Sequence, residues 1–529
     1  MTDRVSEHGA ESLDPNYQHD SQTINRRSML KGAAAAVAGV SLQAAAFQAF
    51  LSKPAEARYK ASSDYGPLEE VLDDNTGLPL LKLPKGFEYT TFSITGETMS
   101  DGSSVPPGHD GMACISERRG KITMVRNHEL GGGTPFGPEG TPTFDATQRG
   151  GTTNLVFDTR RGELVEDWAS LTGTIRNCAG GFNPLLTSWI SCEETTNTGH
   201  GWLFNVPAHG TATAEPIRDA GRFSHEAVAV DPRTGVIYET EDSGICGFYR
   251  FTPKNPFNLE AGGKLEMARV KGSEASLSGA VNLNGGNAGR NNEAASYGLA
   301  AGEGIAIGQS FKIDWVEISE PEATGTSCVE QGILQGGCFF TRGEGAWYDD
   351  GKIFWTSTDG GEARQGQVWE FDIRSSKLTL IFESVDAFAL NNPDNMTIAP
   401  SGAILLCEDG GGVTNSAGVF RGEQMVGLSL DGELFPFAEN NIIIPAGQTL
   451  GGQTGDQRTR EWCGATFSFD GDWLFANIQT PGITFAITGP WERGPLGNSN
   501  HSYNHHGMPF FAQADGPRGH RRNQGRSWA

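Results

Sequence analysis

Several features that would indicate other classes of protein are scarce or missing in this sequence of 529 residues. Positive charge is scarce: 40 Lys and Arg face 64 Asp and Glu, giving a formal net charge of −24, which argues against duplex nucleic acid or an anionic membrane as a partner. No Gly-x-Ser-x-Gly motif stands in a strand-turn-helix setting, which disfavours a covalent serine route. Beyond the N-terminal region, no segment approaches the length of a transmembrane helix.

Glycine, by contrast, is abundant at 72 residues, and aromatic residues make up 9% of the chain. This composition favours many short strands joined by glycine-rich turns over a helical bundle or a disordered chain. The length is too great for one compact α/β core and suits one large domain built from repeats.

The N-terminal region has the pattern of an export signal. Arg26 and Arg27 stand directly before a small apolar run at 32–40, and an alanine-rich stretch leads to a small-x-small site ending at Ala57. We therefore expect a twin-arginine signal peptide over residues 1–57, recognised by the twin-arginine export machinery, and a periplasmic or secreted protein. The alternative is a membrane anchor, which the glycines and Gln43 within the run oppose because they leave it barely long enough to span.

The eight cysteines are scattered and include no Cys-x-x-Cys pair. Twin-arginine substrates fold before export, so an even count is weak evidence for disulfides; Cys328 and Cys338 are close enough in sequence for a small disulfide loop. Cys192 and Cys407 continue apolar strands and are expected in the core. Cys178 lies in a polar, glycine-rich loop, where a metal ligand is favoured over a structural thiol.

One unit recurs along the chain: a turn with Asp and Gly, an apolar strand ending in polar or acidic residues, a glycine-rich loop and a second strand. Five such units predict an all-β fold, a β-propeller with long loop insertions, and six blades once a weaker unit around Asn154–Leu164 is counted. A β-sandwich is the alternative. We expect one domain over 58–529, with an insertion near 253–308 and a loose basic tail near 515–529. The five units begin at Trp189, Asp231, Asp350, Ser401 and Asp470.

Acidic residues gather at the strand ends of these units. In a propeller such ends surround one axis, so the carboxylates would crowd and repel unless cations lay between them. This pattern predicts a centre of several metal ions, and the alternative is that the acids form turns in solvent. The residues are Glu193, Glu194, Glu241, Asp242, Asp359, Glu408 and Asp409.

Further polar segments stand where a propeller would expose them. In Arg342-Gly343-Glu344 the alternation of an extended strand puts the arginine and the glutamate on one face, so that one can grip a phosphate while the other ligates a metal. His225-Glu226 and Cys178 offer more ligands. Each segment alone is compatible with a structural turn.

These motifs resemble those of the PhoX family of alkaline phosphatases, from the N-terminal signal to about Trp491. The resemblance implies a six-bladed propeller that cleaves small-molecule phosphomonoesters at a mixed centre of Fe3+ and Ca2+. The segments on which the resemblance rests are Arg176–Gly181, Ser191–Glu194, Arg222–Glu226, Arg342–Gly345, Asn392–Asn395 and Glu408–Gly411.

The resemblance also assigns residues. Cys178 and Glu344 are implied as iron ligands, and Glu226 as a ligand or bridge. Glu194 is likewise implied as a metal ligand or bridge. Glu193 is the alternative, because the motif does not decide between these two neighbours. Arg342 and Asn154 are implied to hold the phosphate. The implied calcium ligands are Asp394, Glu408 and Asp409.

Two other functions share the predicted propeller. A calcium-dependent lactonase or phosphotriesterase would use the axial carboxylates but would have less use for Cys178 or for the pair of Arg342 and Glu344. A non-catalytic binding propeller braced by calcium would hold no iron and turn over no ester. We expect a monomer with no nucleic acid partner and no stable membrane anchor.

Overall fold

The computed structural model describes residues 64–285 and 304–497. The predicted signal peptide at 1–57 and the basic tail near 515–529 lie outside the described residues, as does part of the insertion near 253–308. Within the described ranges, no helix has both the length and the apolar character needed to cross a membrane.

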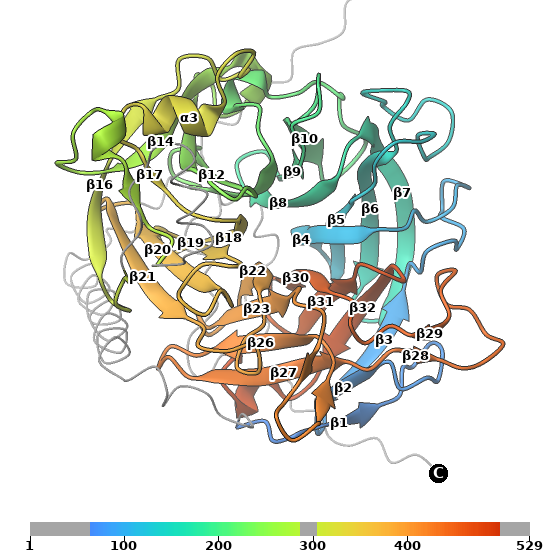
Figure 1. The fold of residues 1–529 in the computed structure, drawn as a ribbon. Helices are drawn as coiled ribbons and strands as arrows, with labels where there is room; N and C mark the ends of the chain where they lie inside the picture. The colour runs from blue at the N-terminus through green and yellow to red at the C-terminus, as the bar shows by residue number, and fades with distance from the viewer. Residues whose placement is uncertain (1–63, 286–303, 498–529) are drawn as a thin grey trace, which may run out of the picture. The chain divides into compact units, whose positions relative to one another are not determined.

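Six strands form a closed ring at the centre of the fold. Each contacts the next in chain order, and the last contacts the first (Figure 1). Equivalent strands around one axis define a propeller, so the predicted fold class is confirmed. The inner strands are β4 (His109–Arg118), β8 (Asn177–Asn183), β11 (His225–Val230), β18 (Gly343–Asp349), β22 (Pro393–Ile398) and β30 (Trp462–Phe467).

Each inner strand begins an antiparallel sheet that runs outward through its successors in the chain. The first sheet is β4, β5 (Lys121–His128), β6 (Gly150–Asp158) and β7 (Glu163–Thr174), and the second is β8, β9 (Ser188–Glu193) and β10 (Leu203–Pro207). The expected weak unit around Asn154–Leu164 therefore supplies the outer strands of the first sheet.

The remaining inner strands continue in the same way. β11 is followed by β12 (Ile237–Glu241), β13 (Phe248–Pro253) and β14 (Gly263–Val270), and β18 by β19 (Lys352–Ser357), β20 (Gln367–Asp372) and β21 (Lys377–Glu383). β22 leads to β23 (Ile404–Glu408), β26 (Gln424–Leu428) and β27 (Leu434–Asn440), and β30 leads to β31 (Trp473–Ile478) and β32 (Ile483–Thr488).

The sheets do not divide clearly into six blades. Strand β16 (Ser310–Glu317) pairs with β14 on one side and with β21 on the other, which joins two four-stranded blades into one nine-stranded sheet. The ring of inner strands has six members, whereas the larger separate sheets number five in the described chain.

The propeller is closed by strands from the beginning of the described chain. β3 (Glu88–Phe92) adds to β32, and the hairpin of β1 (Leu68–Val71) and β2 (Leu81–Pro84) adds to β27. The buried Arg126 side chain ties this junction, donating from Nη1 to Thr484 Oγ1 at 2.7 Å and from Nη2 to Ser93 Oγ at 3.0 Å. One side chain therefore adds hydrogen bonds to both the first and the last part of the propeller, beside the backbone pairing of β3 with β32.

All eight cysteines are buried and unpaired. The disulfide loop considered for Cys328 and Cys338 is not formed, because each thiol instead lies against a different backbone carbonyl: Pro321 for the first, at 3.4 Å, and Ala268 for the second, at 3.3 Å. Cys192 and Cys407 lie in the apolar core, as their strand positions predict.

Candidate metal centre

Every inner strand contains a β-bulge close to its start. The pairing register of each shifts over three residues, for example between Asn177 and Gly180 in β8 and between Gly343 and Ala346 in β18. A bulge redirects the side chain beside it, and bulges are common next to active sites. In five of the six strands, the residue directly after the one at which the register shift begins has a side chain that can ligate a metal. In the sixth strand, β30, this residue is Gly464. The five are Asp110, Cys178, Glu226, Glu344 and Asp394.

Glycine or alanine follows four of these five side chains, all but Asp394, and close packing requires a small residue at two of them. A Cβ atom on Gly111 would lie 2.5 Å from Ala179 Cα, and one on Gly345 would lie 2.7 Å from the carbonyl oxygen of Asp394. Neighbouring inner strands therefore approach more closely than a larger side chain permits. This approach brings the ligand-bearing residues of adjacent strands together.

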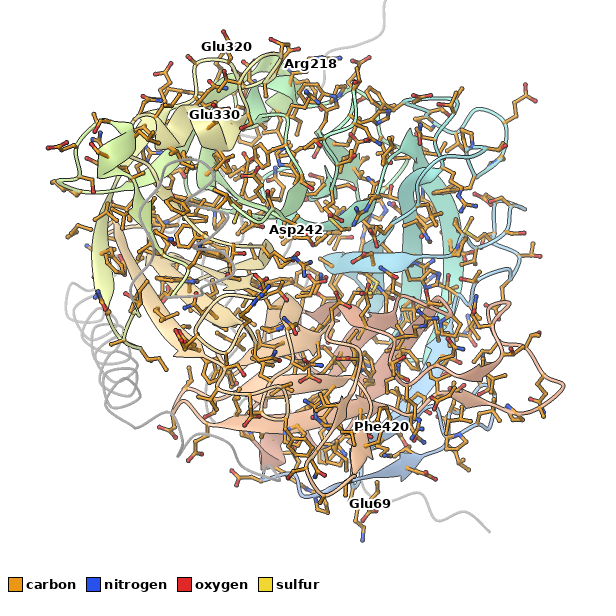
Figure 2. The ribbon with its side chains drawn as sticks, viewed as in Figure 1. Glu69, Arg218, Asp242, Glu320, Glu330 and Phe420 are labelled. Carbon is orange, nitrogen blue, oxygen red and sulfur yellow. The ribbon has the colours of Figure 1, made fainter. Side chains whose placement is uncertain are left out.

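A second set of polar side chains stands directly after the second strand of each sheet. Glu129 follows β5, Glu194 follows β9, Asp242 follows β12 and Asp409 follows β23. The residue before each lies opposite the first residue of the inner strand, as Glu193 lies opposite Asn177. The second set therefore lies beside the bulged ends; Asp242 is labelled near the middle of Figure 2.

Among the residues that the structure describes, potential ligand atoms of nine fall into four groups, each with its atoms within 4.8 Å of one another. Neighbouring groups share a carboxylate: Glu226 joins the first and second, Asp394 the second and third, and Glu461 the third and fourth. A shared carboxylate can bridge two cations, so the groups form a connected series. They are Cys178, Glu194 and Glu226; Glu226, Glu344 and Asp394; Asp394, Asp409 and Glu461; and Asp110, Glu129 and Glu461.

The carboxylates of this series are buried close together, so ionising them costs free energy that bound cations would offset. Burial, followed by the charge of Glu344, raises the pKa of Glu226 well above its ordinary value. Burial also raises the pKa of Glu194 to about 9 and, with the charge of Asp409, that of Asp394 to about 7. Bound cations favour the ionised forms and reverse these shifts.

The donor set fits metal ions. Glu226 Oε1 is buried without a hydrogen-bond partner in the described part of the chain, which a ligated cation would satisfy. The first group combines a cysteine with carboxylates and suits a transition metal, whereas the third and fourth groups offer only oxygen and suit a hard cation such as Ca2+.

Arg342 lies beside the second group. It precedes β18 with a left-handed backbone at φ 42°, and its Nε donates to Asp242 Oδ1 at 2.9 Å. Its Nη2 lies 2.9 Å from Glu344 Oε1. A guanidinium fixed by two carboxylates beside grouped metal ligands is suited to bind a phosphate.

Two predicted metal ligands lie outside the four groups. Glu193 accepts hydrogen bonds from the backbone of Ile175 and Gly201, both at 2.8 Å, and contacts His200 Nδ1 at 2.7 Å. Glu408 is paired with the buried Arg421 through both of its carboxylate oxygens, at 2.6 and 2.9 Å. Each ends the second strand of its sheet, one residue before the ligand-bearing position, and its carboxylate orders the neighbouring loops.

Asn154 also lies outside the groups. It occupies β6, the third strand of its sheet, and its amide donates to the carbonyls of Pro207 and Ala208 at 2.9 and 3.1 Å. These contacts join the first two sheets, so the structure gives Asn154 a packing position.

Three residues of the groups were missed from the sequence: Asp110, Glu129 and Glu461. Asp110 carries the signal that also marks Glu226 and Glu344, a ligand residue followed by Gly or Ala at the start of a strand. Glu129 directly follows an apolar strand, as Glu194 does. Glu461 directly precedes β30 but stands three residues before the bulge position Gly464, not two as Arg176 and Arg342 stand before theirs, and no local pattern distinguishes it.

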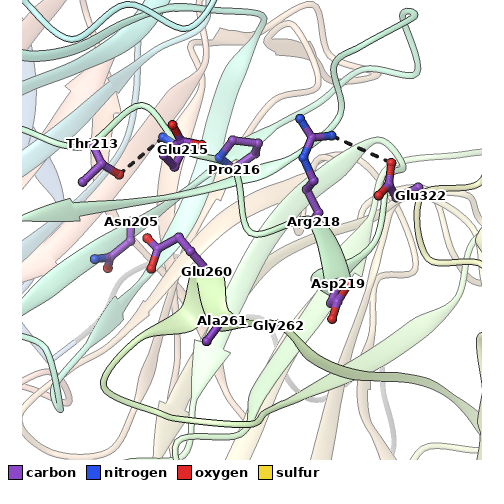
Figure 3. A pocket seen from close by; sticks show the side chains of 10 residues that line it. All are labelled: Asn205, Thr213, Glu215, Pro216, Arg218, Asp219, Glu260, Ala261, Gly262 and Glu322. Carbon is purple, nitrogen blue, oxygen red and sulfur yellow. Dashed lines mark hydrogen bonds and ion pairs between the residues drawn. The ribbon is translucent and has the colours of Figure 1, made fainter.

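A separate cavity of 730 Å³ lies among the loops near β10 (Figure 3). Glu215, Asp219, Glu260 and Glu322 line it together with Arg218, whose Nη1 is 3.8 Å from Glu322. It contains no residue of the four ligand groups.

A closed propeller with a series of metal-ligand groups and a fixed arginine beside them defines a metal-dependent hydrolase of phosphate esters. Comparison of the sequence with known families gives a match to the family described as alkaline phosphatase PhoX over residues 63–482. The chain belongs to the PhoX family and is a phosphoric monoester hydrolase that acts on small-molecule phosphate esters.

The solved structure of a PhoX protein agrees on the fold. PhoX of Pseudomonas fluorescens, solved with vanadate as a transition-state analogue, matches with a TM-score of 0.54 at 15% identity, over 81% of this chain and 99% of that chain. A gluconolactonase of Xanthomonas campestris matches with a TM-score of 0.35 at 14% identity, over 83% and 99% of the two chains. No curated protein sequence matches.

Proposed function

We propose that this phosphatase hydrolyses phosphomonoesters at a centre of Fe3+ and Ca2+, after export by the twin-arginine route. The observation that carries the proposal is the connected series of ligand groups, one with a thiol and the others with oxygen donors alone. Because the groups share carboxylates, the proposed cations would lie close enough to act on one phosphoryl group.

We assign iron to the thiol-containing end of the series. Cys178, Glu194 and Glu226 would hold it, with Glu344 as a further ligand through the group that shares Glu226. Calcium would occupy the oxygen-only groups, with Asp394 and Asp409 as ligands. The carboxylates of Glu461, Asp110 and Glu129 complete these groups.

When bound, the cations supply Lewis acidity and neutralise the charge of the phosphate. Arg342 would bind the phosphoryl oxygens and stabilise their charge in the transition state. Two neighbours prepare it for this role: Asp242 fixes its Nε, and Glu344 fixes its Nη2. The charges of Glu344 and Asp242 also raise the pKa of Arg342, so it stays protonated. Its Nη1 has no hydrogen-bond partner among the described residues and can turn to the substrate.

The test is metal analysis and an absorbance spectrum of protein purified without chelators, with turnover of p-nitrophenyl phosphate at alkaline pH. Iron with calcium, a thiolate-to-iron band and loss of both band and turnover in Cys178→Ala would support the proposal. Calcium alone with turnover of lactones or phosphotriesters would contradict it, and so would calcium alone with no turnover of any ester.

Export rests on the N-terminal sequence, with Arg26 and Arg27 before the apolar run and a cleavage site after Ala57. Replacing both arginines by lysine should leave the protein in the cytoplasm, whereas the native chain should be recovered outside it and begin at Arg58. An unprocessed native chain in the cytoplasm would contradict the proposal. We also propose a monomer, which light scattering of the purified enzyme tests directly.

A further inference from the structure

Arg176 stands before its inner strand in the position that Arg342 occupies two inner strands further on around the ring. Each stands directly before an inner strand, two residues before a ligand-bearing residue: Cys178 for the first and Glu344 for the second. Both have a left-handed backbone, with φ of 48° and 42°. A non-glycine residue rarely adopts this conformation, and such residues cluster at functional sites.

The two guanidinium groups are also held alike. Arg342 lies between Asp242 and Glu344, and Arg176 lies between Glu129, whose Oε1 accepts from its Nε at 2.8 Å, and Glu194, which accepts from its Nη2. Arg342 therefore pairs with one acid of a ligand group, Glu344, and with Asp242 beside the bulged ends, whereas both acids paired with Arg176 belong to ligand groups. The arrangement fixes both side chains without using Nη1, which has no hydrogen-bond partner among the described residues in either case.

The inner strand β11 lies between β8 and β18 in the ring and brings the two arginines to the same part of the centre. Ser224, at the equivalent position before β11, bridges to Glu194 and accepts from the backbone N–H of Asp242 at 3.0 Å. β11 also carries Glu226, which is shared by the ligand groups beside the two arginines. A phosphate held over Glu226 by Arg342 would therefore have Arg176 on its other side.

Exposure distinguishes the two arginines. The side chain of Arg176 is 49% exposed and that of Arg342 is 34% exposed, so Arg176 lies closer to solvent. The reacting phosphoryl group must reach the buried ligands, and the alcohol part of the ester must point outward. Arg222, in contrast, donates from all three of its nitrogens to backbone carbonyls, such as Glu322 O at 3.0 Å, and has no such capacity.

We propose that Arg176 is a specificity-determining residue that contacts the alcohol part of the ester and favours phosphomonoesters carrying a second negative charge. Its fixed guanidinium offers Nη1 to an outer carboxylate or phosphate, and the anchoring by Glu129 and Glu194 reduces the entropy lost on binding. The inference rests on the proposed phosphatase centre and adds the class of substrate that this centre prefers.

The experiment compares two probes of the same shape, 4-carboxyphenyl phosphate and its neutral isostere 4-carbamoylphenyl phosphate, by the ratio of their kcat/KM values. Arg176→Gln should lower this ratio about fivefold to tenfold, because it removes one charge-assisted hydrogen bond at a half-exposed site. Arg176→Lys should retain part of the ratio. Arg218→Gln, in the separate cavity, is the matched control and should leave the ratio unchanged.

An unchanged ratio in Arg176→Gln would overturn the inference, and so would an equal fall for both probes with the metal content retained. Loss of metal from the Gln variant would lower both rates together, in which case the Lys variant decides by the same ratio. Failure of the wild type to hydrolyse either probe would overturn the proposed function, and with it the inference. A changed ratio with a working wild type supports both.

Discussion

Removing the cations should make the protein progressively less stable as the pH rises. The pKa of Asp394 is raised to about 7 from 3.8 by burial and by Asp409, and that of Glu194 is raised to about 9 by burial. A raised carboxyl pKa means that the folded chain binds the proton more tightly than the unfolded chain. The stability is therefore greatest below the unfolded pKa near 4 and is lost as the pH rises through the folded values.

The size of the effect follows from the shift. Asp394 completes most of its loss below pH 7, whereas Glu194, with a folded pKa of about 9, loses about 1.4 kcal/mol per pH unit up to that value, or roughly 3 kcal/mol between pH 6.5 and 9. For roughly 400 ordered residues, an unfolding entropy of about 2.1 cal/mol/K per residue converts this energy into about 4 °C of Tm. Metal-loaded protein should show little of this dependence, because ligated carboxylates remain ionised throughout.

Scanning calorimetry of chelated and metal-loaded protein between pH 6.5 and 9 measures the effect. The window lies above the range in which the buried His109, His128 and His225, whose pKa values burial lowers, would titrate. Glu194→Gln is the matched variant: without metal, it should be more stable than the wild type at pH 9 and lose less Tm with rising pH. A Tm of chelated wild-type protein that stays constant or rises across the window would refute the reasoning.

Three further predictions concern single residues of the site. Cys178→Ala should lose iron while keeping most of its calcium, measured by metal analysis; retention of iron would contradict the ligand assignment. Glu193→Gln should lower Tm, with a loss of about 1–3 kcal/mol from a buried acceptor, yet leave the metal content unchanged. Gly345→Ala should cost more than 2 kcal/mol and reduce turnover, because its Cβ would press on Asp394, whereas Gly325→Ala meets open space and should be neutral.

The repeated turn-strand-loop-strand units were enough to predict the propeller, because each unit buries one apolar strand against the next. The closure could not be predicted, since β3 pairs with β32 about 395 residues along the chain and neither strand has a local marker of its partner. The joining of two blades through β16 was missed for the same reason: that strand directly follows the segment that broke the repeat and pairs with strands far from it in the sequence.

At the site, the sequence predicted which types of residue ligate metal more reliably than it predicted which side chains face the central axis. Cys178, Glu226 and Glu344 lie in the ligand groups because each stands beside a bulge, and a bulge is not visible in the sequence. Glu193 and Glu194 are adjacent, and one residue of register decides which faces the axis. Glu408 and Asp409 differ in the same way: Glu408 pairs with Arg421, whereas Asp409 belongs to a ligand group.

The series of shared carboxylates also sets an order of assembly during synthesis of the chain. The thiol-containing group is complete in sequence once Glu226 has been made, whereas two of the oxygen-only groups await Glu461, more than 200 residues later. We expect a nascent chain to possess all its iron ligands, Glu344 included, before its set of calcium ligands is complete. The ring that positions them all closes only when β30 meets β4, and the propeller is completed after β32 has emerged to pair with β3, so full loading is an event of the finished polypeptide.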